Sequence, residues 1–324
     1  MRVGIVGCGL IGARRAKVAQ DAGDQIVIVA DLAEDRAAAV AATAQAAWTA
    51  TWEEVVSRTD LDAVVVSTSN DYLAAVSVAA LRSGKHVLCE KPLACTVAQV
   101  DAVADASARA GRIAVEAFMY LHHPQILRAI GLAQQGALGR LELVNSTFSF
   151  FLTYPGDPRV NPAMGGGSLW DVGCYPVSLA RRIAGEEPDR IGAFARFDER
   201  GVDRTFIGQL HFPGGLLAQF DCGFAAPDRE RVEIVGSDAT LVLDSPFLPA
   251  PDGPSPSMTI WRGREATPVA VPSIDQYRAE VEDLTAAILD GTPPRLDLAF
   301  SRGSIATLVD LDRAARAHAG MTTG

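Results

Sequence analysis

A lysine held between a glutamate and a proline, in Glu90-Lys91-Pro92, is the first feature of the sequence that could do chemistry. It directly follows the apolar run at residues 87–89, which is typical of a buried strand. A charged pair and a proline are a poor ending for a strand that only packs, and proline keeps the residue before it extended. We therefore expect the Lys91 amine to point at a ligand. The alternative is an exposed charged pair after a strand, which is common in α/β proteins.

A glycine-rich turn near the N-terminus predicts a dinucleotide site. Gly7-Cys8-Gly9-Leu10-Ile11-Gly12 matches the G-x-G-x-x-G pattern and lies between an expected strand and an expected helix. There the glycines permit a tight turn and the close approach of a pyrophosphate, whose charge the helix N-terminus stabilises. A plain glycine turn is the alternative. The predicted cofactor-binding residues of this turn are Gly7, Gly9, Leu10, Ile11 and Gly12.

Asp31 bears on which dinucleotide is bound. It follows the second expected strand about 20 residues after Gly12, where a carboxylate can bond both hydroxyls of an adenosine ribose. A carboxylate there repels a 2′-phosphate, so the sequence favours NAD as the cofactor. NADP stays open because Arg36 could reach a phosphate. A solvated helix residue is the alternative interpretation of Arg36.

A second set of reactive side chains follows three glycines in the second half of the chain. Gly165-Gly166-Gly167 would let the backbone pass close to a ligand, and Asp171 and Tyr175 then lie at i and i+4 on one face of an expected helix. A phenol beside an ammonium can take the proton of an alcohol that gives up hydride to a nicotinamide. A local cap at Asp171 and a half-buried aromatic at Tyr175 are the alternatives.

The first part of the chain alternates short Val/Ile-rich strands with Ala-rich helices, a rhythm that predicts a parallel sheet with helices on its faces. Thr96 predicts a helix start, and Gly84 and Gly111 predict helix ends. Because parallel strands end at one edge, Ser67, Thr68, Asn70, Glu90 and Lys91 are predicted cofactor contacts. The expected strands are residues 2–6, 25–30, 63–67, 86–89 and 112–116, and the expected helices are residues 11–22, 34–44, 52–57, 72–83 and 97–110.

After Pro124 the rhythm changes. Alternating segments from residue 191 to residue 270, separated by turn signals, predict a meandering antiparallel sheet. Residues 246–256 are expected to form a surface loop. The other expected elements are a helix ending at residue 135, a strand at 141–152, a helix at 168–184 and final helices at 275–289 and 300–319.

Composition narrows the class of partner. A net charge of −10 with no cluster of Lys and Arg argues against nucleic acid or an anionic membrane, and no apolar run approaches the roughly 18 residues of a membrane span. The five cysteines lack metal-ligand spacing and predict free thiols in a reducing cytoplasm. We expect no metal ion, because His122 and His123 are adjacent and would splay apart.

Taken together, the motifs resemble those of the glucose-fructose oxidoreductase / inositol dehydrogenase (Gfo/Idh/MocA) family of NAD(P)-dependent dehydrogenases. The matching segments are the glycine turn, residues 84–94 around Lys91, residues 116–120, and the triple glycine through Asp171 and Tyr175. The resemblance spans the whole chain. It implies a doubly wound Rossmann domain at residues 1–120. It also implies a substrate-binding and oligomerisation α/β domain with a large, mainly antiparallel open sheet at residues 121–324, whose last helix is a candidate to pack back on the first domain.

The resemblance also implies roles for individual residues. Lys91 would contact the substrate hydroxyl and the nicotinamide region, with a cis peptide before Pro92. Tyr175 would be the acid/base and Asp171 would position the substrate, as in the branch that contains glucose-fructose oxidoreductase, xylose dehydrogenase and dimeric dihydrodiol dehydrogenase. The open sheet would serve as the interface of a homodimer or homotetramer.

Departures from the family pattern concern the substrate more than the reaction. Leu73 stands where a histidine is usual, and Leu121 replaces the usual arginine and is followed by an unexpected His122. On position alone, the candidate substrate contacts are Tyr120, His123, Phe151 and Asn161.

The function that these features predict is NAD(P)-dependent hydride transfer at a secondary alcohol or hemiacetal carbon of a sugar, a sugar derivative or a cyclic diol. Two alternatives stay open: a keto-sugar reductase of a biosynthetic pathway, and a nucleotide-binding regulator without turnover. The presence of both Lys91 and Tyr175 favours an enzyme, because a regulator would be free to lose either.

Overall fold

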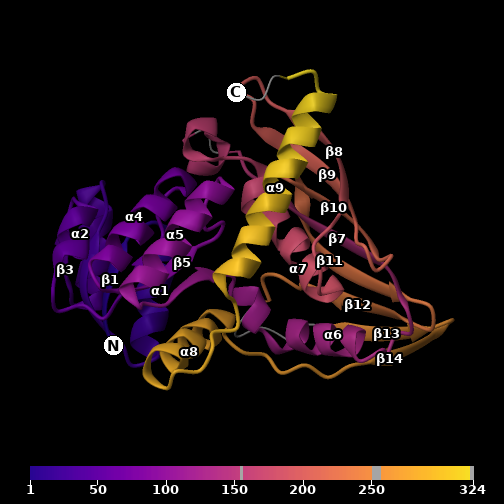
Figure 1. The fold of residues 1–324 in the computed structure, drawn as a ribbon, viewed down its shortest axis with the longest axis horizontal. Helices are drawn as coiled ribbons and strands as arrows, with labels where there is room; N and C mark the ends of the chain where they lie inside the picture. Colours follow the sequence, from indigo (N-terminus) through magenta and orange to yellow (C-terminus); the bar gives the residue numbers. More distant parts are fainter. Residues whose placement is uncertain (154–155, 250–256, 322–324) are drawn as a thin grey trace. The chain divides into compact units, whose positions relative to one another are not determined.

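The structure is a computed structural model that describes residues 1–153, 156–249 and 257–321. The chain divides into two units (Figure 1). Unit 1 consists of Met1–Met119 and Gln276–Ile305, and unit 2 of the described parts of Tyr120–Asp275 and Ala306–Gly324. The predicted second domain, residues 121–324, includes the segment Gln276–Ile305, which lies in unit 1. Residues 250–256 of the expected surface loop lie outside the described residues.

Unit 1 is built on a six-stranded sheet with the order β3-β2-β1-β4-β5-β6, in which every pair of neighbouring strands is parallel. Its inner strands are apolar because helices cover both faces; all four residues of β4 are buried. The strand order reverses between β1 and β4, where open α/β sheets bind ligands. The strands are β1 (Arg2–Val6), β2 (Gln25–Ala30), β3 (Ala47–Thr49), β4 (Ala63–Val66), β5 (His86–Glu90) and β6 (Ala114–Ala117).

The helices of unit 1 lie within two residues of the predicted ones. Thr96 forms a capping box with Gln99 at the start of α5, and Gly111 ends that helix in the left-handed conformation. Gly84 follows the last turn of α4 with a φ of 81°. The helices are α1 (Leu10–Asp21), α2 (Glu34–Ala44), α3 (Trp52–Ser57), α4 (Asn70–Arg82), α5 (Val97–Ala110), α8 (Gln276–Leu289) and the first part of α9 (Leu298–His318).

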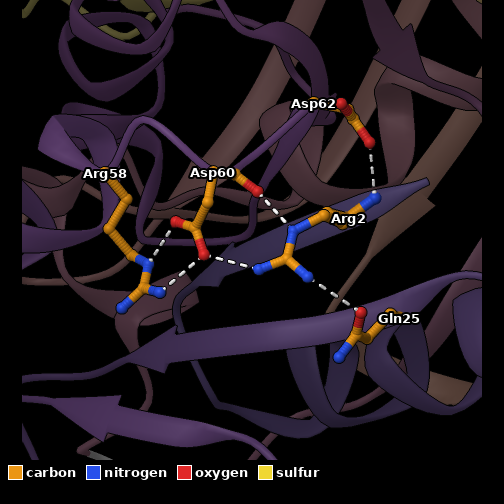
Figure 2. A network of polar contacts seen from close by, with 5 residues as sticks. All are labelled: Arg2, Gln25, Arg58, Asp60 and Asp62. Atoms are coloured by element: carbon orange, nitrogen blue, oxygen red, sulfur yellow. Dashed lines mark hydrogen bonds and ion pairs between the residues drawn. The ribbon is translucent and has the colours of Figure 1, made fainter.

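A polar network joins the starts of the strands, at the edge of the sheet opposite the glycine turn (Figure 2). The Arg2 guanidinium donates to the Asp60 carboxylate and carbonyl and to the Gln25 amide oxygen, while Arg58 donates to Asp60 from the other side. The Arg2 amide donates to Asp62. Hydrogen bonds from Arg58 and then Arg2 hold the pKa of Asp60 well below its usual range. Because these side chains are exposed, we interpret the network as a tether of strand starts and not as a reactive site.

Unit 2 is built on an eight-stranded sheet with the order β14-β13-β12-β11-β7-β10-β9-β8. It is mainly antiparallel, as predicted, but β7 and β10 are parallel. This departure from a simple meander arises because β7 inserts between β10 and β11 and pairs with both. The strands are β7 (Leu141–Phe151), β8 (Arg190–Phe197), β9 (Asp203–His211), β10 (Leu217–Gly223), β11 (Ala225–Gly236), β12 (Thr240–Asp244), β13 (Met258–Arg262) and β14 (Glu265–Pro268).

Helices α6 (Pro124–Gln134) and α7 (Cys174–Ala184) lie along one face of this sheet (Figure 1). On β9 the side chains alternate: Phe206 and Leu210 are buried, whereas Ile207 between them is exposed. The expected helix at residues 168–184 is divided, because its first turn, Leu169–Gly173, is π-helical and α7 begins only at Cys174. Among the described residues, no helix combines the length and the apolar character that a membrane crossing requires.

Candidate active site

The glycine turn leaves room for a ligand at one of its three glycines. A Cβ atom at Gly7 would lie 2.3 Å from the Ser67 carbonyl oxygen, and one at Gly12 would lie 1.8 Å from the Gly7 carbonyl oxygen. These two glycines are therefore required by the packing of the chain itself. A Cβ at Gly9 would meet no atom within 4 Å, and Gly9 caps α1 without a side-chain bond. Open space at a helix N-terminus suits a pyrophosphate, so these residues fit the predicted dinucleotide.

Asp31 is held by three hydrogen bonds at the end of β2. The Cys8 amide donates to Oδ2 at 2.7 Å, and the Ala33 amide and Arg36 Nη2 donate to Oδ1 at 2.8 and 2.7 Å. Burial alone would raise the pKa of Asp31, but these bonds outweigh it and keep the pKa below its usual range. Arg36 is more than a solvated helix residue, because it is paired with the carboxylate that is predicted to bind the ribose.

The other predicted cofactor contacts of unit 1 lie at the same edge of the sheet. Ser67 follows β4, and its hydroxyl donates to the Gly7 carbonyl at 2.8 Å, so it supports the glycine turn. The Thr68 hydroxyl donates to the Ser69 carbonyl at 3.2 Å, and Asn70 is the first residue of α4.

Two apolar side chains at this edge were missed by the sequence analysis. Leu32 follows β2 with 87 % of its surface exposed, and Tyr72 lies in the first turn of α4 with 51 % exposed. Apolar surface that the fold leaves open beside a glycine turn suits the flat rings of a dinucleotide. For Leu32 the available signal was a large apolar residue two positions after the predicted strand end at residue 30.

The Glu90-Lys91-Pro92 turn is fastened on both sides within unit 1. The peptide between Lys91 and Pro92 is cis, as the family resemblance implied. Before the turn, the Glu90 carboxylate accepts a hydrogen bond from Arg15 Nε at 2.7 Å. After it, the Leu93 amide donates to the buried Glu116 carboxylate at 2.9 Å. Sequence reasoning did not find Arg15 or Glu116 as supports of this turn.

Tyr175 lies in the first turn of α7 and belongs to an aromatic cluster. The rings of Tyr120, Phe148 and Phe247 each lie 5.2 to 5.4 Å from its ring centroid. The Tyr120 hydroxyl shares a hydrogen bond of 2.7 Å with the Ser178 hydroxyl and donates to the Tyr175 carbonyl at 3.3 Å. Tyr120, a candidate substrate contact, is thus fully buried and supports the turn of α7 that carries Tyr175.

Asp171 lies in the π-helical turn before α7. Arg159 Nη1 lies 3.6 Å from Asp171 Oδ2, and the Arg159 guanidinium also bonds Asp157 in a bidentate manner. A π-helical turn is wider than an α-helical one, so the i, i+4 face predicted for Asp171 and Tyr175 is distorted at Asp171. Such turns are frequent at functional sites.

The triple glycine before this turn is explained by contacts of the chain with itself. A Cβ at Gly166 would lie 2.7 Å from the carbonyl oxygens of Arg159 and Asn161, and one at Gly167 would lie 2.2 Å from Asp203 Oδ1. The close approach to a ligand that we expected here remains a prediction.

The remaining candidate substrate residues differ in exposure. His123 is buried at the N-cap of α6, where its Nδ1 accepts from the Gln125 amide, and burial lowers its pKa. Asn161 caps a 3-10 turn by accepting from the Ala163 amide. Phe151, the last residue of β7, is 60 % exposed. In the described part of the chain, no three His, Cys, Asp or Glu side chains are grouped as metal ligands.

The two leucines that depart from the family pattern are core residues. Leu73 in α4 is fully buried, and Leu121 is 2 % exposed. Both side chains pack in the core, so the structure gives them a packing role.

Each unit thus holds one half of the predicted constellation. Unit 1 collects the glycine turn, Asp31 and the Lys91 turn at one edge of its sheet, and unit 2 collects Asp171, Tyr175 and their supports around the start of α7. The family model of the oxidoreductase family with an NAD-binding Rossmann fold matches residues 1–118, and the model of the GFO/IDH/MocA C-terminal domain matches residues 126–242. The chain belongs to the GFO/IDH/MocA family of oxidoreductases.

Relatives in the GFO/IDH/MocA family extend over almost the whole chain. A D-xylose 1-dehydrogenase (NADP(+)) of Haloferax volcanii is 35 % identical over 306 residues, which are 92 % of each protein. A dTDP-3,4-didehydro-2,6-dideoxy-alpha-D-glucose 3-reductase of Actinomadura kijaniata is 31 % identical over 97 % of this chain and 95 % of the relative. The crystal structure of a 3-ketoreductase from Actinomadura kijaniata in complex with NADP and TDP-benzene superposes with a TM-score of 0.91, at 28 % identity and 97 % coverage of each chain.

These similarities confirm the family and the fold class predicted from the motifs. The protein is an oxidoreductase with a Rossmann domain for a nicotinamide dinucleotide, and the family assignment favours an enzyme over a regulator without turnover.

Proposed function

We propose that the protein transfers hydride between NAD(P) and a secondary alcohol or hemiacetal carbon of a sugar, a sugar derivative or a cyclic diol. The observation that carries this proposal is the turn at Lys91, which is fastened on both sides at the sheet edge that holds the glycine turn. The similarity to a xylose dehydrogenase and to a keto-sugar reductase supports a carbohydrate-like substrate.

The proposed mechanism assigns the proton to Tyr175. During oxidation, the substrate hydroxyl gives its proton to the Tyr175 oxygen while its carbon loses hydride; during reduction, Tyr175 returns the proton to the new hydroxyl. The Lys91 ammonium stabilises the negative charge that develops on the substrate oxygen during proton and hydride transfer. Asp171, with Arg159 beside it, accepts a hydrogen bond from a neighbouring substrate hydroxyl and so fixes the substrate. A bound nicotinamide supplies the hydride acceptor or donor.

For the cofactor, the position of Asp31 supports NAD, and the position of Arg36 also allows NADP to bind. A carboxylate in place to bond two ribose hydroxyls favours NAD. Arg36, already paired with that carboxylate, carries the charge that a 2′-phosphate needs. The Haloferax volcanii relative is named as an NADP(+) enzyme and the 3-ketoreductase structure is a complex with NADP, which supports NADP binding.

The second candidate function is reduction of a keto-sugar. It is favoured by the 3-ketoreductase structure, whose fold matches this chain over 97 % of its length. The same residues serve both directions, because an enzyme does not shift the equilibrium. The substrate panel below separates the two.

We also propose a homodimer or homotetramer formed through the open sheet of unit 2, in a reducing cytoplasm. Phe194, Ile207 and Leu217, on the neighbouring strands β8, β9 and β10, are each about half exposed or more. A group of exposed apolar side chains on one sheet is typical of a protein interface. All five cysteines are free thiols, four of them buried, which suits a reducing compartment.

The test is a panel of aldoses, inositols, diols, nucleotide sugars and keto-sugars, followed by absorbance of the reduced nicotinamide. On the substrate that this panel finds, Lys91→Ala and Tyr175→Phe should each lower kcat by about 10²- to 10⁴-fold while dinucleotide binding persists. Lys17→Ala is the matched control, because Lys17 is 71 % exposed and pairs with Asp21 on its own helix. Wild-type rates in either site variant would show that the assigned mechanism is wrong.

A further inference from the structure

Arg15 is a buried arginine in the second turn of α1, directly behind the glycine turn. Its side chain is 1 % exposed. Nε donates to Glu90 on β5 at 2.7 Å, and Nη1 donates to Glu280 on α8. The ring centroid of Tyr277, also on α8, lies 4.8 Å from the guanidinium carbon. One cation therefore joins three elements of unit 1 that are far apart in sequence.

The ion network of Arg15, Glu90 and Glu280 is unusual for a core. Burial would lower the pKa of Arg15, but Glu280 and Glu90 raise it, so the guanidinium stays charged. Glu90 and Glu280 are 12 % and 2 % exposed, which makes both carboxylates costly to bury without their cation. A buried ion network is often no more stabilising than apolar side chains of the same size. Geometry is therefore a better explanation of this network than stability.

The network of Arg15, Glu90 and Glu280 determines the geometry of the Lys91 turn. Glu90 is the residue before Lys91, and its side chain is held by Arg15. The backbone two residues after Lys91 is held by Glu116. Lys91 thus lies between two buried anchors, Arg15 and Glu116. Of these two, Arg15 lies on the helix of the glycine turn and also bonds Glu280 on α8.

We propose that Arg15 is a positioning residue for the reaction, which acts through Glu90 to fix Lys91 and is itself held by Glu280 of the returning helix α8. This role rests on the proposed function, in which Lys91 stabilises the reacting oxygen. Without Arg15, the Glu90 and Glu280 carboxylates lose the cation that they share, and Glu90 loses its anchor. Lys91 then samples positions away from the reacting oxygen, and a displacement of about 1 Å costs up to 10²-fold in rate.

The experiment compares three variants of the full chain with one control. Arg15→Met removes the cation. Arg15→Lys keeps the charge but lacks the planar guanidinium that bonds both carboxylates. Glu280→Gln weakens the bond between Arg15 and α8 and leaves the bond between Arg15 and Glu90. Lys17→Met is the control, since it removes an exposed cation from the same helix. For each protein we would measure kcat per dinucleotide-binding site, the dinucleotide Kd, and amide hydrogen exchange of the segments 90–94, 2–6 and 63–66.

The expected result for Arg15→Met is a kcat at least about 10-fold lower, with the dinucleotide Kd within about 3-fold of wild type. Exchange should become at least about 10-fold faster at residues 90–94, while residues 2–6 and 63–66 keep wild-type rates. Arg15→Lys and Glu280→Gln should lie between wild type and Arg15→Met, and they carry the test if Arg15→Met does not fold. Lys17→Met should match wild type throughout.

Two outcomes would overturn the proposal. One is normal kcat per binding site in all three variants; the other is faster exchange spread evenly over the three segments, which would make Arg15 a general stability residue. If wild-type protein turned over no member of the substrate panel, the proposed function would fail. Hydrogen exchange would still test whether Arg15 anchors the Lys91 turn. Faster exchange in the variants at residues 90–94 alone supports this role, and unchanged exchange there overturns it.

Discussion

Asp31, the carboxylate that is predicted to bind the adenosine ribose, is already held by hydrogen bonds within the protein. A carboxylate offers about four acceptor positions, and three are used by Cys8, Ala33 and Arg36. The two hydroxyls of the predicted ribose would need two positions, so their binding would require that one bond within the protein be released. The exposed Arg36 is the group that can leave at low cost, because its side chain is 57 % exposed while the other two donors are backbone amides.

This arrangement predicts that Asp31 and Arg36 act oppositely on cofactor choice. Asp31→Ala should weaken NADH binding by about 10- to 100-fold, the cost of lost hydrogen bonds to a charged acceptor, and weaken NADPH binding less. Arg36→Ala should weaken NADPH binding more than NADH binding, because a 2′-phosphate loses its cation. Fluorescence titration with both reduced dinucleotides measures the ratio. An unchanged NADH to NADPH ratio in Asp31→Ala would remove Asp31 from the determinants of specificity.

At the scale of elements, the π-helical turn Leu169–Gly173 is held at its start by a buried carboxylate from the sheet. Asp203 on β9 accepts hydrogen bonds from the Ser168 hydroxyl at 2.5 Å and from the Leu169 amide at 2.8 Å. The same carboxylate occupies the space that a Cβ at Gly167 would need. Asp203 therefore sets where the helical segment with Asp171 and Tyr175 begins, and it accounts for the glycine before that segment.

We predict that Asp203→Ala lowers the free energy of unfolding by about 1–3 kcal/mol, because it leaves a buried amide and a buried hydroxyl without their acceptor.

Burial raises the pKa of Asp203 despite the bonds from Ser168 and Leu169. The stability that protonated Asp203 contributes is therefore fully present below pH ~4, the pKa of an aspartate in the unfolded chain. It is lost as the pH rises through the raised pKa of the folded state. Asp203→Asn keeps an acceptor and cannot ionise, so it should reduce this loss. Urea unfolding at pH 5 and pH 8 measures both effects, with the exposed Asp310→Ala as control; equal pH dependence in Asp203→Asn and wild type would contradict the argument.

The parallel sheet of unit 1 was predictable because most residues of its longer strands are apolar and because Ala-rich helical segments separate them. The short β3 was missed, since Ala47-Trp48-Thr49 contains no Val or Ile and Trp48 is 44 % exposed. The insertion of β7 between β10 and β11 could not be predicted, because alternating side chains show which face of a strand is buried but not which strand lies beside it.

The same distinction applies to the candidate site. Local motifs indicated the glycine turn, Asp31 and Lys91, since each lies in a recognisable context of strand and turn. The supports of the site were not visible in the sequence, because they come from distant segments: Glu280 lies 265 residues from Arg15, and Asp203 lies 35 residues from Ser168. A buried arginine in a helix also has no signature that separates it from an exposed one.

At the scale of the whole molecule, the prediction about assembly concerns the face of β8 to β10 on which Phe194, Ile207 and Leu217 are exposed. Ile207 on β9 is 50 % exposed and lies opposite Phe194 on β8, which is 62 % exposed. If this face forms the proposed interface, Ile207→Arg places a charge in an apolar contact and should shift sedimentation at micromolar concentration from dimer or tetramer to monomer. Leu289→Arg at the end of α8 is the matched control, because Leu289 is a 68 % exposed leucine outside this sheet. An Ile207→Arg protein that sediments as wild type does would place the interface elsewhere, whereas dissociation with unchanged dinucleotide binding would separate assembly from the cofactor site of unit 1.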